Sequence, residues 1–264
     1  YSYGLMLALG FIVASYLLSL ELKRKRLDPN LAGNITIAAL VGGIVGSKLW
    51  FLAEHWGSFL ADPVGMAFSP GGLTFYGGFL AAALTIYFYL RSKKIRFLLV
   101  ADAVAPGLLL GYGVARIGCH LSGDGDYGFP TTLPWGTDYS KGVLPPSQAF
   151  RDLPEIASQY PGGIVPDTTL CHPTPVYELI LCAILFAVMW KYRRAIVREG
   201  KMFMLYLMLA GAERFMIEFI RINPRIVFGL TQAQLVAAAL IAAGITGWIV
   251  LSRRPDPHRR PSAP

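Results

Sequence analysis

The stretch Gly111–Gly128, GYGVARIGCHLSGDGDYG, decides the fold because it joins an apolar run to a polar, glycine-rich segment. Arg116 lies inside the apolar run, and an arginine at membrane depth is costly and usually faces a polar site. His120 follows four residues later, on the same face if the helix continues. Asp124 and Asp126 come next, among glycines. The pattern predicts a functional site where a membrane helix meets water; a capped helix end with a snorkelling arginine is the simpler interpretation.

The composition indicates an all-α polytopic membrane protein. The 264 residues are 54% hydrophobic and only 15% charged, with a mean hydropathy of +0.49, whereas about 25% charged residues is typical of soluble domains. The net charge of +8 could indicate a nucleic-acid partner, but the basic residues lie in short clusters between apolar runs. That pattern is typical of membrane topology, so we expect no nucleic-acid partner. Three cysteines without metal-type spacing predict no metal site.

Seven apolar runs are candidates for transmembrane helices, each close to the roughly 20 residues that cross the hydrocarbon. The expected spans are Tyr1–Leu20, Ile35–Leu52, Gly71–Leu90, Phe97–Gly118, Pro173–Trp190, Met202–Ile222 and Leu230–Leu251. They form one predicted domain, residues 1–252. It includes a small cap at residues 119–172, between spans four and five, and precedes a tail at residues 253–264. Residues 57–70 are expected to form an outer loop.

Clusters of basic residues predict the orientation of these spans. Most of the 24 Lys and Arg residues lie in four clusters, and a seven-span layout puts all four on one side. The clusters are Lys23–Arg26, Arg91–Arg96, Lys191–Lys201 and Arg253–Arg260. Because cytoplasmic loops carry the excess of Lys and Arg, the N-terminus and the cap are predicted outside and the C-terminus in the cytoplasm.

The sixth predicted span is the most charged. Arg214, Glu218 and Arg221 are spaced i, i+4, i+7, on one face of a continuous helix. Arg214 and Glu218 could form an ion pair, which lowers the cost of burying either. The alternative is that this pair only fixes helix packing. With Arg116 near the outer end of its own span, the arginines would converge on an anion. A guanidinium offers a planar fork of donors that suits phosphate, and a lipid headgroup is the phosphate at that depth.

Other polar residues of the spans have weaker claims. Glu178, beside Tyr177 in HPTPVYE, either orients an arginine or caps a helix start. Lys48 and Asp102 are expected to have structural partners. The glycines of the second span permit close helix packing; they are Gly42, Gly43 and Gly46. A disulfide between Cys119 and Cys171, which flank the cap, is one option, but spacing alone does not place their sulfurs.

Five motifs carry a resemblance to a known family. They are Tyr3–Met6 (YGLM), Gly71–Gly78 (GGLTFYGG), Ala115–Gly128, His172–Glu178 and Arg214–Arg221. In this order, over nearly the whole chain, they resemble the prolipoprotein diacylglyceryl transferases, which are enzymes of the bacterial inner membrane. The resemblance implies transfer of a diacylglyceryl group from phosphatidylglycerol to the lipobox cysteine of a preprolipoprotein signal peptide. Glycerol phosphate would be the leaving group, and no cofactor or metal is implied.

The resemblance also implies roles for individual residues. Arg116 and Arg214 would hold the lipid phosphate, Glu218 would orient Arg214, and Tyr3 would line the lipid cavity. The remaining substrate-binding candidates are Asp124, Asp126, Tyr177, Glu178 and Arg221. The chain departs from the family pattern at four positions: Tyr76 replaces a histidine, Cys119 an asparagine, Asp124 a glutamate, and Ala210 a common tyrosine.

The departure at Tyr76 affects the expected proton acceptor. A free tyrosine has a pKa of about 10, so it is a neutral phenol and a poor base at neutral pH. His120, with a reference pKa of about 6.5, is the predicted base, oriented by Asp124 or Asp126. The alternative is that His120 only lines the headgroup region. Tyr76 would then donate a hydrogen bond to the lipid. The main alternative is a non-catalytic subunit that binds anionic lipid; a small transporter is less favoured because no internal repeat is visible.

Overall fold

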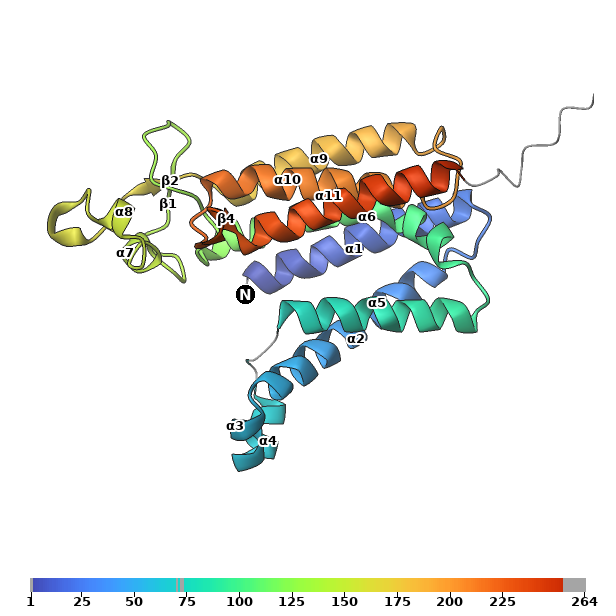
Figure 1. Cartoon of the computed structure of the whole chain (residues 1–264), viewed down its shortest axis with the longest axis horizontal. Coiled ribbons are helices and arrows are strands. Elements are labelled where there is room, and N and C mark those ends of the chain that lie inside the picture. The colour runs from blue at the N-terminus through green and yellow to red at the C-terminus, as the bar shows by residue number, and fades with distance from the viewer. Residues whose placement is uncertain (1, 70, 72–73, 254–264) are drawn as a thin grey trace, which may run out of the picture. The chain divides into compact units, whose positions relative to one another are not determined.

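The computed structural model describes residues 2–69, 71 and 74–253 and is mostly helical (Figure 1). The chain divides into two compact units. Unit 1 comprises residues 1–17 and 101–264, and unit 2 comprises residues 18–100. The predicted tail lies outside the described residues except for Arg253.

Seven long helices in the described part of the chain correspond to the seven predicted spans. They are α1 (Ser2–Arg24), α2 (Leu31–Glu54), α5 (Phe75–Ser92), α6 (Phe97–Ser122), α9 (Thr174–Tyr192), α10 (Lys201–Ile217) and α11 (Gln232–Arg253). Five of them, α1, α2, α6, α9 and α11, are long and apolar enough to cross a membrane. The structure therefore confirms a helical protein with several membrane spans. Helix α10 has 17 residues and is shorter than each of these five helices.

In unit 2, α2 packs closely along α5 because small residues face each other. A Cβ atom added to Gly46 would lie only 2.1 Å from the Cβ of Ala81, so the two backbones approach more closely than larger side chains allow. Lys48 donates to the carbonyl and hydroxyl oxygens of Ser69 at 2.9 and 2.8 Å, which is the structural partnership expected of it. The predicted outer loop instead contains two short helices, α3 (Trp56–Ala61) and α4 (Pro63–Phe68).

In unit 1, α6 is the central element. Its Gly111 lies against Gly10 of α1, where a Cβ on Gly10 would lie 2.6 Å from the Gly111 carbonyl oxygen. Asp102 of α6 caps α10 by accepting hydrogen bonds from the backbone N–H groups of Gly200 and Phe203 at 2.7 and 2.9 Å. A carboxylate at a helix N-terminus is favourable, which explains this buried acid without a catalytic role. Apolar residues complete this core: Ala105, Leu109, Cys182, Met189 and Met202.

The segment between α6 and α9 folds around its own small core. Helix α6 continues to Ser122, so the first residues of the predicted cap are helical. Strands β1 (Thr137–Asp138) and β2 (Leu170–Cys171) pair antiparallel, and short helices α7 (Pro146–Ala149) and α8 (Pro154–Ala157) and the 3-10 turn η1 (Pro161–Gly163) lie between them in sequence. Their core residues are Tyr127, Tyr139, Phe150, Val165 and Cys171.

The end of the sixth predicted span is the main departure from a continuous helix. Helix α10 ends at Ile217, and a 3-10 turn η2 (Glu218–Ile220) follows. Arg221 is extended, with φ −88° and ψ 157°, and forms an isolated antiparallel bridge with Gly128. Strands β3 (Arg225–Val227) and β4 (Leu230–Thr231) then pair antiparallel before α11. The prediction that Arg221 shares one helical face with Arg214 is therefore wrong.

Candidate active site

Three arginines and three carboxylates meet inside unit 1. We call them the arginine–carboxylate cluster: Arg116, Arg214, Arg221, Asp126, Glu178 and Glu218. They come from α6, the loop that follows it, α9, α10, η2 and the residue after η2. Formal charges of three cations and three anions balance within the cluster.

Glu178 is the centre of the cluster and its side chain is fully buried. Its Oε2 atom lies 2.9 Å from Nε of Arg116, and its Oε1 atom lies 3.0 Å from Nη1 of Arg214. Nη1 of Arg221 lies 3.5 Å from Oε2. Burying a lone carboxylate costs several kcal/mol, and the three arginines offset this cost for Glu178. Of the two interpretations of Glu178, its contacts favour the orientation of arginines.

Glu218 holds the other side of Arg214. Its Oε2 atom lies 2.9 Å from Nη2 of Arg214, so the ion pair predicted from the i, i+4 spacing is present. Nε of Arg221 lies 3.7 Å from the same oxygen. The turn η2 brings Arg221 back toward the cluster, and the N–H of Phe129 donates to the carbonyl of Ile220 at 3.1 Å. The three guanidinium groups therefore converge although they do not share one helix face.

Asp126 connects the loop after α6 to two arginines, pairing with both Arg116 and Arg221. Its side chain is 28% exposed, whereas those of Glu178 and Glu218 are fully buried. Burial raises the pKa of Asp126, but Arg221 and Arg116 outweigh this, so its pKa lies below the ordinary value. Asp126 is thus an ionised, partly accessible carboxylate on a loop.

Tyr112 is a member of the site that the sequence reasoning missed. Its hydroxyl donates to Oε1 of Glu178 at 3.0 Å and accepts from Nε of Arg116 at 3.0 Å. It lies four residues before Arg116 on α6, so the i, i+4 spacing was a signal that could have identified it. Tyr112 fixes the orientation of the Arg116 guanidinium together with Glu178.

His120 contacts the cap. Its Nδ1 atom lies 2.9 Å from the hydroxyl of Tyr139, and the two rings meet edge to face. Among the residues that the structure describes, no aspartate contacts the His120 ring as expected: Asp126 pairs with arginines, and Asp124 accepts from the Asp126 backbone N–H at 3.3 Å. Tyr139 lies in a segment without sequence periodicity, so no pattern pointed to it.

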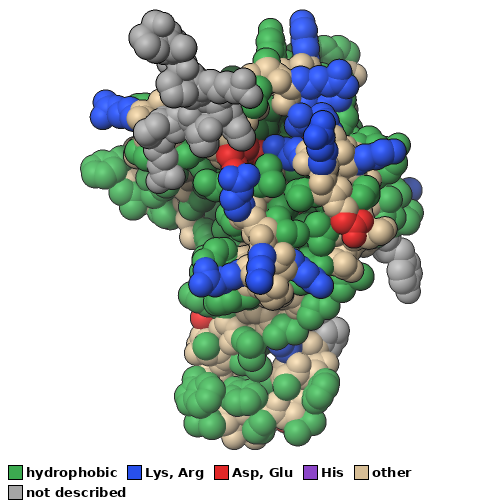
Figure 2. All heavy atoms as spheres, turned by 90° about the vertical axis from the view of Figure 1, so that its right-hand side faces the viewer, with side chains coloured by type: hydrophobic (Ala, Val, Ile, Leu, Met, Phe, Trp, Pro, Cys, Tyr) green, Lys and Arg blue, Asp and Glu red, His purple; other side chains and the backbone are tan. Residues whose placement is uncertain are grey.

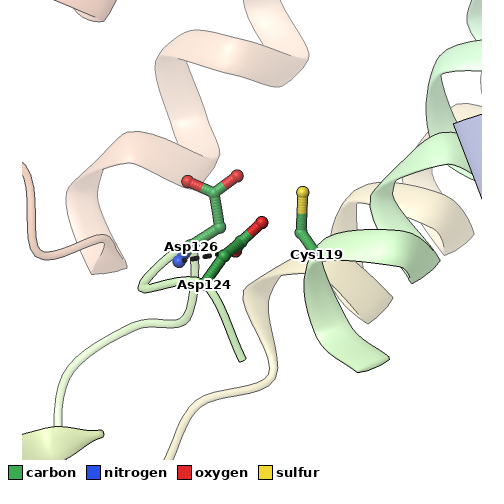
Figure 3. Close-up of side chains that lie close together, drawn as sticks. All are labelled: Cys119, Asp124 and Asp126. Atoms are coloured by element: carbon green, nitrogen blue, oxygen red, sulfur yellow. Dashed lines mark hydrogen bonds between the residues drawn. The ribbon is translucent and has the colours of Figure 1, made fainter. Parts of the chain in front are cut away.

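Cys119, Asp124 and Asp126 face one another beside the cluster (Figure 3). Their potential ligand atoms all lie within 4.8 Å of one another. However, Nη1 of Arg116 lies 3.4 Å from the Cys119 sulfur and also pairs with Asp126. The Arg116 guanidinium therefore already supplies a positive charge to Cys119 and Asp126. We therefore assign the three residues to the surroundings of Arg116. Cys119 and Cys171 are buried free thiols, so the optional disulfide is not formed.

The other predicted residues lie elsewhere. Tyr177 accepts a hydrogen bond from Nε1 of Trp135 at 2.7 Å and lies 3.2 Å from Nδ1 of His172, so it contacts the cap. Tyr3 lies on α1, where its backbone packs against Gly118 of α6. Tyr76 is in the first turn of α5, in unit 2, and its side chain is 43% exposed.

These features define a class: a multi-pass helical membrane protein with a buried cluster of arginines and carboxylates. The chain belongs to the prolipoprotein diacylglyceryl transferase family, whose family model matches residues 1–250. The chain is accordingly a membrane transferase of that family, as the five motifs predicted.

Curated relatives match the chain over almost its full length. A protein of Clostridium tetani is 30% identical over 247 residues, covering 93% of this chain and 90% of the relative. One of Corynebacterium diphtheriae is 31% identical over 258 residues, covering 96% and 88%. One of Nostoc is 28% identical over 270 residues, covering 99% and 89%. All three are named phosphatidylglycerol–prolipoprotein diacylglyceryl transferase.

Proposed function

We propose that this chain transfers the diacylglyceryl group of phosphatidylglycerol to the lipobox cysteine of a preprolipoprotein. The thiolate sulfur forms a bond to the lipid glycerol carbon, and the carbon–oxygen bond to the phosphate breaks. Glycerol phosphate leaves with the electron pair, and the thiol proton passes to a base. The observation that carries the proposal is the convergence of Arg116, Arg214 and Arg221 around one buried centre, with the family membership of the chain in support.

The arginines bind the phosphate and stabilise the charge that develops on it. Arg116 pairs with one carboxylate oxygen of Glu178 and Arg214 pairs with the other, so this one carboxylate sets the separation of the two guanidinium groups. Donors that are fixed before the reaction need no reorganisation when negative charge appears on the leaving group. Glu218 and Arg221 complete the frame that holds Arg214.

A phosphate can join this cluster only if a carboxylate leaves it, because the cluster is already neutral. Asp126 is the carboxylate best placed to leave. Its side chain is the most exposed of the three, and it follows Gly125, which has a φ of +90°. Its backbone stays anchored, since its carbonyl accepts a hydrogen bond from the Thr174 hydroxyl. Departure of the Asp126 carboxylate leaves one net positive charge, which matches the single negative charge of a phosphodiester.

His120 is the proposed base, with its ring oriented by Tyr139. When Nδ1–H donates to the tyrosine oxygen, the other ring nitrogen, Nε2, carries a free lone pair that can accept the thiol proton. Tyr76 donates a hydrogen bond to the lipid in this scheme. Asp124, Tyr3 and Tyr177 contribute to substrate binding near the periplasmic surface of the inner membrane.

The proposed topology is seven spans in the bacterial inner membrane, with the N-terminus and the cap in the periplasm and the C-terminus in the cytoplasm. The one-sided basic clusters support this orientation. It would place the arginine–carboxylate cluster at the periplasmic ends of α6 and α10, close to the cap. A preprolipoprotein signal peptide would reach it there from the membrane.

Complementation tests the proposed function. The chain is expressed in a bacterium depleted of its own diacylglyceryl transferase, and growth and lipoprotein mass are measured. Growth with diacylglyceryl-modified lipoproteins is the expected result. Failure to modify lipoproteins, despite normal amounts of folded protein in the membrane, would contradict the proposal and favour the non-catalytic lipid-binding alternative.

A further inference from the structure

A second basic site lies in unit 2, where α5 ends and α6 begins. A cavity of about 490 Å³ is lined by Tyr87, Arg91, Lys94, Ile95, Arg96 and Phe97. Three of these residues are cationic, and no acidic residue lines the cavity. The rings of Tyr87 and Phe97 meet edge to face, with centroids 6.0 Å apart. The cavity thus combines concentrated positive charge with an aromatic wall, and it shares no residue with the arginine–carboxylate cluster.

The backbone at Lys94 is held in an unfavourable conformation. Lys94 has a φ of +56°, its N–H donates to Arg91 at 3.0 Å, and the N–H of Ile95 donates to Leu90 at 2.9 Å. These bonds form a Schellman turn, in which the left-handed position normally belongs to glycine. A lysine there has a steric cost that the turn itself does not require. Such departures from local preference concentrate at functional sites.

The end of α1 provides an internal comparison. Arg26 has a φ of +60°, its N–H donates to Lys23 at 3.1 Å, and the N–H of Leu27 donates to Leu22 at 2.9 Å. This is the same turn with a cation at the same position, but Arg26 does not line the cavity. A cation near a helix C-terminus is favourable in both turns. That effect accounts for one cation in each turn, whereas three cations line the single cavity at the end of α5.

We propose that this cavity binds a phosphate group, in the first place the headgroup of an anionic phospholipid. Guanidinium and ammonium groups satisfy phosphate oxygens, and an aromatic wall suits the neighbouring glycerol backbone. Figure 2 shows a face of the molecule with many Lys and Arg side chains and few acidic ones. The topology proposed above puts the cavity at the cytoplasmic membrane surface, where anionic headgroups attract basic residues. A soluble phosphate compound has the same chemistry and is the alternative source.

The test uses the full-length protein in detergent, titrated with phosphatidylglycerol and measured by native mass spectrometry. Wild type is compared with Lys94→Gly, and with Arg26→Gly as the matched control that removes one charge from an equivalent turn. We expect Lys94→Gly to weaken one lipid-binding step about fivefold, the effect of one lysine near anionic headgroups. Arg26→Gly should bind as wild type does. The melting temperature of Lys94→Gly should be unchanged or raised, because glycine suits the turn.

The source of the phosphate is distinguished by a competition with inorganic phosphate. Loss of only the Lys94-dependent step indicates a soluble phosphate compound, and retention of that step indicates a lipid headgroup; both support a phosphate site. Equal binding by all three proteins, or an equal loss in Arg26→Gly, would overturn the proposal. A lowered melting temperature in Lys94→Gly would overturn its premise that the lysine is held at a steric cost.

Discussion

Asp126 joins Arg116 to Arg221, because each of its carboxylate oxygens pairs with the guanidinium of one of them. The two arginines come from segments about a hundred residues apart in sequence, and the loop carboxylate links them. In the proposed mechanism, a phosphate oxygen takes the position of the Asp126 carboxylate between the same two cations. Asp126 is thus a stabilising ion-pair partner and, in the proposed mechanism, a competitor of the substrate.

The first prediction separates these two effects. Asp126→Asn should lower the KM for phosphatidylglycerol several-fold, because the cluster gains a net positive charge. The same change should destabilise the protein by about 3 kcal/mol or more, because two charge-assisted contacts of about 1.5–3 kcal/mol each are lost. Lipidation kinetics and thermal unfolding in detergent measure the two effects. Asp152→Asn, which removes a carboxylate at an exposed position of the cap, is the control and should keep the wild-type KM. A raised KM in Asp126→Asn would rule out the competition.

The second prediction concerns pH. The pKa of Asp126 is lower in the folded state than its ordinary value. Its ionised form therefore stabilises the fold at pH values above the unfolded pKa of about 3.9, and this contribution is lost as the pH falls through the folded pKa. Wild type should be more stable than Asp126→Asn at neutral pH, and the difference should shrink below about pH 4. A difference in melting temperature that stays constant from neutral to acidic pH would contradict the ionic role.

The sequence predicted the helices and most of the charged cluster because both depend on local signals. Long apolar runs give the helices, and a charge inside such a run, as at Arg116 or Arg214, is rarely neutral in function. The position of Arg221 could not be predicted from spacing, because the helix ends at Ile217 and the bridge to Gly128 depends on a distant segment. Tertiary contact, which spacing does not encode, decides such positions.

The partner of His120 was unpredictable for a related reason. Tyr139 lies in the cap, whose short helices and two-residue strands leave no periodic pattern. The nearest acids in sequence, Asp124 and Asp126, were the expected partners, but Asp126 is drawn to the arginines. A carboxylate pairs more strongly with two arginines than with an imidazole, so closeness in sequence to His120 did not decide the partners of Asp126.

The third prediction tests the two arginines that are proposed to bind the phosphate. Replacing Arg116 or Arg214 with lysine keeps the charge but removes the planar fork of donors. Each change should lower phosphatidylglycerol turnover tenfold or more, consistent with about 1.5–3 kcal/mol per charge-assisted contact. Arg151→Lys, at an exposed position of the cap, is the matched control and should retain activity. Normal turnover in Arg116→Lys and Arg214→Lys would exclude the assigned role.

The fourth prediction tests the topology. Lys93→Cys and Lys141→Cys place single thiols at exposed positions before α6 and within the cap, respectively. Only the thiol in the cap should react with a membrane-impermeant maleimide added to intact spheroplasts. The three native cysteines are buried, so little background labelling is expected. Equal labelling of both variants from outside would show that the proposed orientation is wrong.

The last prediction concerns the proton acceptor and its orientation. His120→Gln should strongly reduce the lipidation rate and abolish the dependence of that rate on the titration of an imidazole. Tyr139→Phe should keep the ring stacked on Tyr127, with centroids 4.3 Å apart, while removing the hydroxyl that contacts Nδ1. Its melting temperature should therefore change little, but its rate should fall and its pH profile shift, because the ring is no longer held in one tautomer.

Tyr76→Phe distinguishes this assignment from its competitor. If Tyr76 only donates a hydrogen bond to the lipid, its loss should raise the KM more than it lowers kcat, and the pH profile should be unchanged. The opposite outcome is an inactive Tyr76→Phe beside a His120→Gln that keeps the wild-type rate and pH profile. That result would transfer the essential proton chemistry to the tyrosine.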